Sequence, residues 1–137
     1  MTEYTAGNVA PYIETDFDLP EAQQWIDGIV AKFETLDLSI MMECFTDDVA
    51  VDYAGYGKLN GKDAVRDFLA SRYASLSQYS LKKIARCVTG NVVGIDATVS
   101  FHDGSDETHK SGRAFEFLTV RDGKICRWDN VSIYTTS

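Results

Sequence analysis

The stretch NVVGIDATVSFH, residues 91–102, has a strict two-residue period. One face of an extended chain would carry its apolar residues, Val93, Ile95, Ala97, Val99 and Phe101. The opposite face would carry glycine and polar residues, namely Gly94, Asp96, Thr98, Ser100 and His102. This alternation is typical of an antiparallel strand with one face on a core and the other in water. It predicts a long, half-buried strand and guides the interpretation of the segments around it.

The segments around this strand continue the β pattern. Turn-forming residues occur in HDGSDE, residues 102–107, and in RDG, residues 121–123. They separate stretches that alternate as strands do. The strand at 91–102 is therefore expected to belong to an antiparallel meander, whose other members lie at about 81–89, 108–121 and 124–134.

The first half of the chain has helical periodicity instead. Pro20 suits the first turn of a helix, with Asp18 or Leu19 just before it. One face of this predicted helix is continuous and apolar, and it consists of Ala22, Trp25, Ile26, Ile29, Val30 and Phe33. Asp37 is placed to cap a second, short helix. Its expected buried stripe is Leu38, Met41, Met42 and Phe45.

A short strand and a third helix are expected next. Val49, Val51 and Tyr53 alternate as in a strand, and the glycine-rich GYGKLNG at 55–61 is expected to be a loop. A helix then opens at Asn60 or Gly61, with apolar positions at Val65, Phe68, Leu69, Tyr73 and Leu76. Helices followed by a meander predict an α+β fold, with the helices packed on one face of a curved antiparallel sheet.

The composition limits the classes of partner. The chain has 137 residues, which suits one domain, expected over 19–137 after a polar arm at 1–18. Its net charge of -8 disfavours nucleic acid and anionic membrane surfaces as partners. No basic segment followed by an apolar run opens the chain, and no stretch approaches a membrane span, so a cytoplasmic protein is expected. Three cysteines without ligand spacing support neither a disulfide framework nor a zinc site, and no metal is expected.

Three motifs resemble one family. LDLSIMMECFTDDVAVDY at 36–53, GYGKLNGKDAVRDFL at 55–69 and RDGKICRWDN at 121–130 are similar to segments of ketosteroid isomerase, limonene epoxide hydrolase, the SnoaL-like polyketide cyclases and nuclear transport factor 2. The resemblance covers about residues 20–134. It implies a cone-shaped fold, in which three N-terminal helices close a strongly curved sheet around an apolar pocket, and it implies a homodimer. It implies no cofactor. Because this fold hosts many activities, the resemblance is specific for fold and weak for function.

The family's catalytic sets carry over only in part. At the positions of the steroid isomerase tyrosine donor and aspartate base, this chain has Ile29 and Tyr53, and the third acidic position falls at or next to Glu116. At the positions of the epoxide hydrolase Asp-Arg-Asp set it has Ala97, Val99 and Asn130, none of them charged. SnoaL-like cyclases need one pocket acid, and that requirement is the one the sequence meets.

Glu116, within RAFEFL at 113–118, is the leading candidate for that acid. If it shares an inward face with Ala114 and Leu118, desolvation would raise its pKa toward neutral and suit it to acid/base chemistry. Phe115 and Phe117 would then lie on the convex face as a dimer surface. In the alternative, the phenylalanines point inward and Glu116 points to solvent, pairing with Arg113 or Lys110.

The other candidate residues are assigned around Glu116. Tyr53 would donate a hydrogen bond to a developing oxyanion, although a core aromatic is an equally good interpretation, and Asn130 would orient a substrate oxygen. Tyr56 would be a second donor. The remaining substrate-binding candidates are the apolar and aromatic residues Trp25, Ile29, Phe33, Phe68, Ala97, Val99, Leu118 and Trp128.

Three functions remain open at this point. The first is a cofactor-independent enzyme that isomerises, cyclises or dehydrates a small hydrophobic molecule such as a polyketide or terpenoid. The second is a non-catalytic binding or scaffold protein of the same fold. The third, less favoured, is epoxide opening by a variant set of residues.

Overall fold

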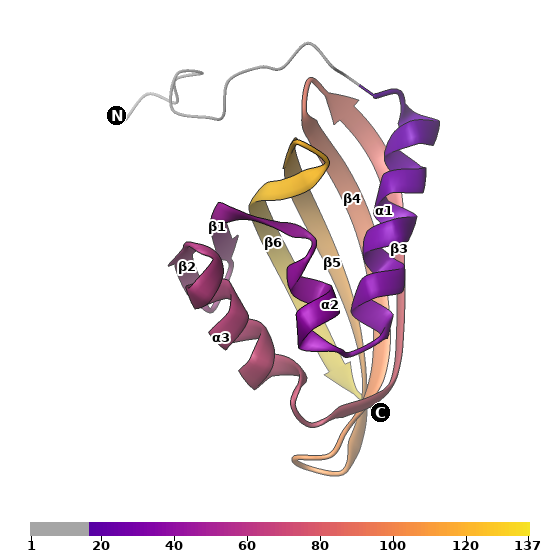
Figure 1. Ribbon diagram of the computed structural model, residues 1–137. Coiled ribbons are helices and arrows are strands. Elements are labelled where there is room, and N and C mark those ends of the chain that lie inside the picture. Colours follow the sequence, from indigo (N-terminus) through magenta and orange to yellow (C-terminus); the bar gives the residue numbers. More distant parts are fainter. Residues whose placement is uncertain (1–16) are drawn as a thin grey trace, which may run out of the picture.

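The computed structural model describes residues 17–137. Within them, three helices lie on one face of a curved six-stranded sheet, as Figure 1 shows. The elements are α1 Leu19–Glu34, α2 Leu38–Met42, β1 Phe45–Tyr53, β2 Gly57–Asn60, α3 Lys62–Tyr73, β3 Leu76–Thr89, β4 Val92–Asp103, β5 Thr108–Arg121 and β6 Lys124–Thr136. This arrangement confirms the predicted α+β fold. The predicted arm at 1–18 lies outside the described residues, apart from Phe17 and Asp18.

The two helix starts expected at aspartates are confirmed. Asp18 accepts a hydrogen bond from the Glu21 amide at 2.9 Å, and the Glu21 side chain accepts one from the Asp18 amide at 3.2 Å. This reciprocal capping box fixes the start of α1. Asp37 caps α2 by accepting from the amide of Ser39 at 2.9 Å. Both caps set how the helices approach the sheet.

The strand order is β2-β1-β6-β5-β4-β3. The last four strands of the chain form the predicted antiparallel meander, and β1 adds to it by pairing in parallel with β6. In Figure 1, α1 runs along β3, while α3 lies beside β1 and β2. The concave face of the sheet is thereby covered by helices.

Two local predictions were wrong. GYGKLNG is not all loop, because Gly57–Asn60 forms β2 and pairs antiparallel with β1. Gly57, at φ 139°, starts this strand in a conformation that side chains rarely adopt. Leu76, assigned to the third helix, is instead the first residue of β3, since α3 ends at Tyr73. Both errors lie at element boundaries, where periodicity is the weakest guide.

The inward face of the sheet is the one that the alternation predicted. Val93, Ile95 and Ala97 are buried, whereas Thr98 is exposed. The same parity continues onto β5, and this decides the orientation of RAFEFL. Glu116 is 3 % exposed, whereas Phe115 and Phe117 are 56 % and 55 % exposed on the convex face.

None of the helices found in residues 17–137 combines the length and the apolar character that crossing a bilayer would require.

Candidate active site

Glu116 lies in the middle of β5 with its carboxylate on the concave side of the sheet. Its neighbours in register are Ile95 on β4 and Asn130 on β6. Trp128 Nε1 and Asn130 Nδ2 both donate to Oε2, at 2.6 and 2.7 Å. Lys83 Nζ, from β3, donates to Oε1 and forms an ion pair in which its own side chain is 9 % exposed. Two strands, β3 and β6, therefore place three donors on one buried carboxylate.

The expectation of an unpaired acid with a raised pKa was wrong. Burial alone would raise the pKa of Glu116, but the charge of Lys83 opposes it, as do hydrogen bonds from Lys83, Asn130 and Trp128. Together these lower the pKa below its ordinary value of 4.5. Glu116 is therefore a carboxylate at neutral pH, and in chemical terms it is a base with an ammonium group beside it.

Sequence reasoning missed Lys83, although a signal for it existed. In LKKIA, residues 81–85, Lys83 shares a face with Leu81 and Ala85, and the structure pairs it with the inward Ala97. A lysine at an apolar parity position on a strand indicates an inward cation. Nothing in the sequence, however, indicates that its partner is the carboxylate 33 positions further along the chain.

A chain of polar groups leads from Glu116 toward the open end of the cone. Ser132 Oγ donates to Asn130 Oδ1 and lies 3.1 Å from the Tyr53 hydroxyl. A serine hydroxyl has one proton, so the proton in the second contact comes from Tyr53. Tyr53 OH lies 3.2 Å from Tyr134 OH, which accepts a hydrogen bond from Arg72 on α3.

A cavity of about 40 Å³ surrounds the inner end of this chain. Glu116, Lys83, Asn130 and Tyr53 line it, as do Trp128 and other aromatic residues. A second, outer hollow of about 270 Å³ lies next to it. The two share Tyr73, Tyr79, Val99 and Tyr134 as walls. These four residues, here called the partition, separate the buried carboxylate from the outer hollow.

Three buried tyrosines of the inner cavity, Tyr53, Tyr73 and Tyr79, are proton donors rather than bases. Burial is the main cause that raises the pKa of Tyr53, Tyr73 and Tyr79 above the ordinary tyrosine value. Tyr73 and Tyr79 also hold each other, with hydroxyl oxygens 3.4 Å apart and rings in edge contact. All three therefore remain protonated over the physiological range.

The structure brings together some of the predicted site residues. Tyr53, Asn130, Phe33, Ala97, Val99 and Trp128 line the inner cavity with Glu116. Ile29, Phe68 and Leu118 are buried in the core instead, and they are not among the cavity walls. Tyr56, expected as a second donor, is 63 % exposed and its ring packs on Phe68.

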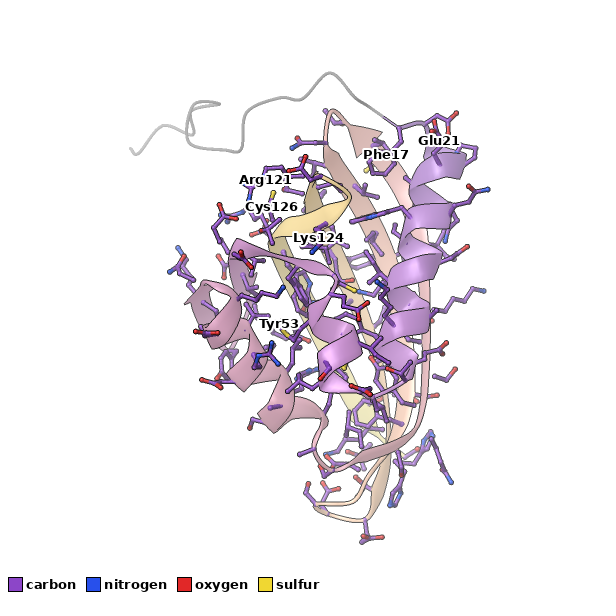
Figure 2. The ribbon with its side chains drawn as sticks, in the orientation of Figure 1. Phe17, Glu21, Tyr53, Arg121, Lys124 and Cys126 are labelled. Carbon is purple, nitrogen blue, oxygen red and sulfur yellow. The ribbon has the colours of Figure 1, made fainter. Side chains whose placement is uncertain are left out.

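Trp25 was expected as a pocket wall, but it belongs to a different part of the molecule. Its Nε1 donates to the carbonyl of Gly123 at 2.8 Å, and it lines a groove with Phe17 and Arg121. Figure 2 shows Phe17, Glu21 and Arg121 at the end where β5 turns into β6, well away from Tyr53. Trp25 lies here because its indole contacts the turn after β5. Helical periodicity cannot reveal a contact of this kind.

The residues at the outer end were also missed. Arg72, Tyr73, Tyr79 and Tyr134 come from the end of α3, the start of β3 and the end of β6. Tyr79 lies on β3 and Tyr134 on β6, the two outer strands of the meander. The curvature of the sheet brings both side chains to the outer hollow. Their pattern in the sequence is that of ordinary strand aromatics.

Solved structures of known proteins share this fold. An epoxide hydrolase/cyclase-like enzyme, SalBIII, of pyran ring formation in the polyether salinomycin has a TM-score of 0.74 at 16 % identity, over 88 % of this chain and 98 % of that chain. A candidate SnoaL-like polyketide cyclase from Shewanella denitrificans has a TM-score of 0.71 at 11 % identity, over 83 % and 91 %. An M. tuberculosis epoxide hydrolase of the limonene type has a TM-score of 0.66 at 16 % identity, over 82 % of both chains.

At these identities the likeness shows the fold alone, and it confirms the cone that the sequence predicted. No curated protein matches the chain. A family model described as the SnoaL-like domain matches residues 22–128, from the first turn of α1 into β6. The chain therefore belongs to the SnoaL-like domain family.

Proposed function

We propose that the protein is a cofactor-independent acid/base enzyme of the isomerase, cyclase or dehydratase type. Its substrate would be a small hydrophobic molecule of polyketide or terpenoid character. One observation carries the proposal: the Glu116 carboxyl group is held by three donors in a cavity whose other walls are mainly aromatic and aliphatic. Family membership adds support, because SnoaL-like relatives include a candidate polyketide cyclase.

The proposed step is proton transfer beside a carbonyl group. A Glu116 oxygen takes a proton from the carbon next to the carbonyl, the C–H bond breaks, and its electron pair forms the enolate. Lys83 is placed to donate to the enolate oxygen, where the negative charge develops, and Tyr53 would donate to the same oxygen in place of its contact with Ser132. Returning the proton to another carbon completes an isomerisation. Alternatively, the enolate carbon attacks a second carbonyl and closes a ring, and the alkoxide formed there takes the proton back from Glu116.

The space around Glu116 constrains how a substrate enters. A cavity of about 40 Å³ holds a few water molecules and nothing larger. Small-molecule pockets begin at roughly 300 Å³, a size that is approached only when the outer hollow is added. The substrate would therefore occupy the outer hollow and reach Glu116 when the partition tyrosines turn aside.

A non-catalytic binding protein is the second candidate, and one observation favours it. Lys83, Trp128 and Asn130 already satisfy the Glu116 carboxylate from within the chain. A buried ion pair such as Lys83 and Glu116 can hold strands together without taking part in catalysis. Epoxide opening is less favoured, because Ala97 and Val99 line the cavity without charge.

The partner that we propose besides the small molecule is a second copy of this chain. Phe115, Phe117, Val131 and Ile133 are exposed on the convex face of β5 and β6. The charged side chains around them are ion-paired, because Arg86 and Arg113 share Asp96 and Arg127 pairs with Asp129. This convex patch therefore carries no excess negative charge, and two copies of an acidic chain can approach through it with little repulsion.

An exchange experiment separates enzyme from binder. The protein is incubated in D₂O with a panel of apolar 1,3-diketones and β,γ-unsaturated ketones, and NMR follows the loss of the protons next to the carbonyl. The proposal predicts catalysed exchange that Glu116→Gln reduces by roughly 10²-fold or more, with ligand affinity retained. Glu43→Gln, on an exposed ion pair away from the cavity, is the matched control and keeps full activity. Binding without exchange would instead establish the second candidate.

A further inference from the structure

Arg72 occupies an unusual position at the end of α3. Its guanidinium carbon lies 5.0 Å from the centre of the Tyr53 ring and 5.1 Å from that of Tyr134. It donates to the Tyr134 hydroxyl and lines the outer hollow. Aromatic faces on two sides hold the planar group in place, and a guanidinium has five N–H donors. With the hydrogen bonds to Tyr134 and Tyr73 counted, some of these five N–H donors are left for a ligand.

No carboxylate of residues 17–137 forms an ion pair with Arg72. In contrast, Arg86 and Arg113 pair with Asp96, and Arg121 pairs with Asp48. The chain has 21 acidic against 13 basic residues, so carboxylates are plentiful. A half-buried arginine without one is therefore a cation that lacks its usual partner.

The other charges on the walls do not neutralise Arg72. In the outer hollow, Asp103 pairs with Lys110 at 2.9 Å, and it also accepts hydrogen bonds from Ser75 and Ser105. In the inner cavity, Glu116 pairs with Lys83, and Arg113 pairs with Asp96. Each negative wall residue is thus already matched, which leaves Arg72 as the excess charge. A positive lining inside an acidic protein concentrates small anions.

We propose that Arg72 binds the anionic head of the ligand, a planar group with two oxygens such as a carboxylate or the enolate of a 1,3-dicarbonyl. The fork of a guanidinium matches such a group with two parallel hydrogen bonds. The apolar remainder would pass between the partition tyrosines toward Glu116. This inference rests on the proposed ligand cavity, and it narrows the substrate class from hydrophobic molecules to hydrophobic monoanions.

The test compares two probes that differ only in the head group. Isothermal titration calorimetry measures the affinity of the full chain for 2-naphthoate and for neutral 2-naphthamide. Wild-type protein is expected to prefer the acid by roughly tenfold or more, as charge-assisted hydrogen bonds do. Arg72→Met should bind both probes equally. Arg66→Met removes the same charge from the exposed side of the same helix and should keep the preference.

Each remaining outcome also decides the matter. The inference is overturned if the wild-type protein shows no preference for the acid, or binds neither probe at millimolar concentration. It is also overturned if Arg72→Met keeps the preference for the acid, or if Arg66→Met loses that preference to the same extent. If Arg72→Met no longer binds the amide, Arg72→Lys decides: a partial acid preference supports the inference and none contradicts it. Failure of the proposed enzyme activity can be told apart from failure of the Arg72 inference. In the first case the protein would catalyse no exchange but would still prefer the acid. Conversely, exchange on neutral ketones without any acid preference would overturn only the role of Arg72.

Discussion

Lys83 and Glu116 stabilise each other because both side chains are buried from bulk solvent. Removing Lys83 leaves Glu116 buried with hydrogen bonds but no countercharge, so Lys83→Met is expected to destabilise the protein by about 3–5 kcal/mol at neutral pH. Adding Glu116→Gln should recover part of that loss, since the amide has no charge to compensate. Urea unfolding of the four members of this cycle measures the coupling. Additive losses would show that the pair contributes nothing as a pair.

The lowered pKa of Glu116 makes the stability of the fold depend on pH. A carboxyl whose pKa is lower folded than unfolded stabilises the protein above its unfolded value and loses that contribution as pH falls through the folded value. The free energy of unfolding should therefore fall more steeply from pH 6 to pH 3 in wild type than in Glu116→Gln. Chemical unfolding across this range provides the measurement. Parallel curves would mean that folding does not perturb Glu116.

Single residues were partly predictable. The inward position of Glu116 was the favoured one of two open orientations: parity fixes every residue of a strand once one is placed, and the family resemblance placed one. Its protonation state did not follow, because it depends on Lys83, whose strand is brought alongside only by the fold. The sequence thus identified the acid and missed the cation that determines its chemistry.

Gly112 on β5 sets the position of Tyr134 on β6. The two residues are cross-strand partners, and a Cβ at Gly112 would lie 2.6 Å from the Tyr134 ring. Gly112→Ala should displace that ring, disturb its hydrogen bonds with Tyr53 and Arg72, and cost about 1–3 kcal/mol of stability. In α1, Gly28→Ala meets nothing within 4 Å and should instead stabilise by roughly 0.5–1 kcal/mol. Thermal unfolding and near-ultraviolet circular dichroism compare the two. An unchanged aromatic signal in Gly112→Ala would contradict the account.

Helices and strands were easier to predict than the roles of single residues wherever the hydrophobic pattern continued over many residues. The strand at 91–102 and the first helix were predicted by uninterrupted patterns and by the Asp18 cap. β2 was missed, because four residues around glycine give too little alternation to show pairing. The start of β3 was missed since Leu76 fits a helical stripe and a strand equally well.

The whole molecule is proposed to be a dimer through the convex patch. Val131 is 58 % exposed and lies opposite Phe115 in the register. Val131→Asp should place like charges at the interface and yield monomers, while Tyr56→Asp changes an equally exposed aromatic elsewhere and should not. Size-exclusion chromatography with light scattering reads the mass. A monomeric wild-type protein would refute the dimer.

The central claim is that an ionised Glu116 is the base of a buried acid/base site, and the pH dependence of catalysed deuterium exchange tests it most directly. The lowered pKa predicts a rate that stays flat through neutral pH and falls only below the ordinary glutamate value of 4.5, with that dependence lost in Glu116→Gln. A rate that halves near neutral pH, or a Glu116→Gln protein with the wild-type rate and profile, would contradict the account.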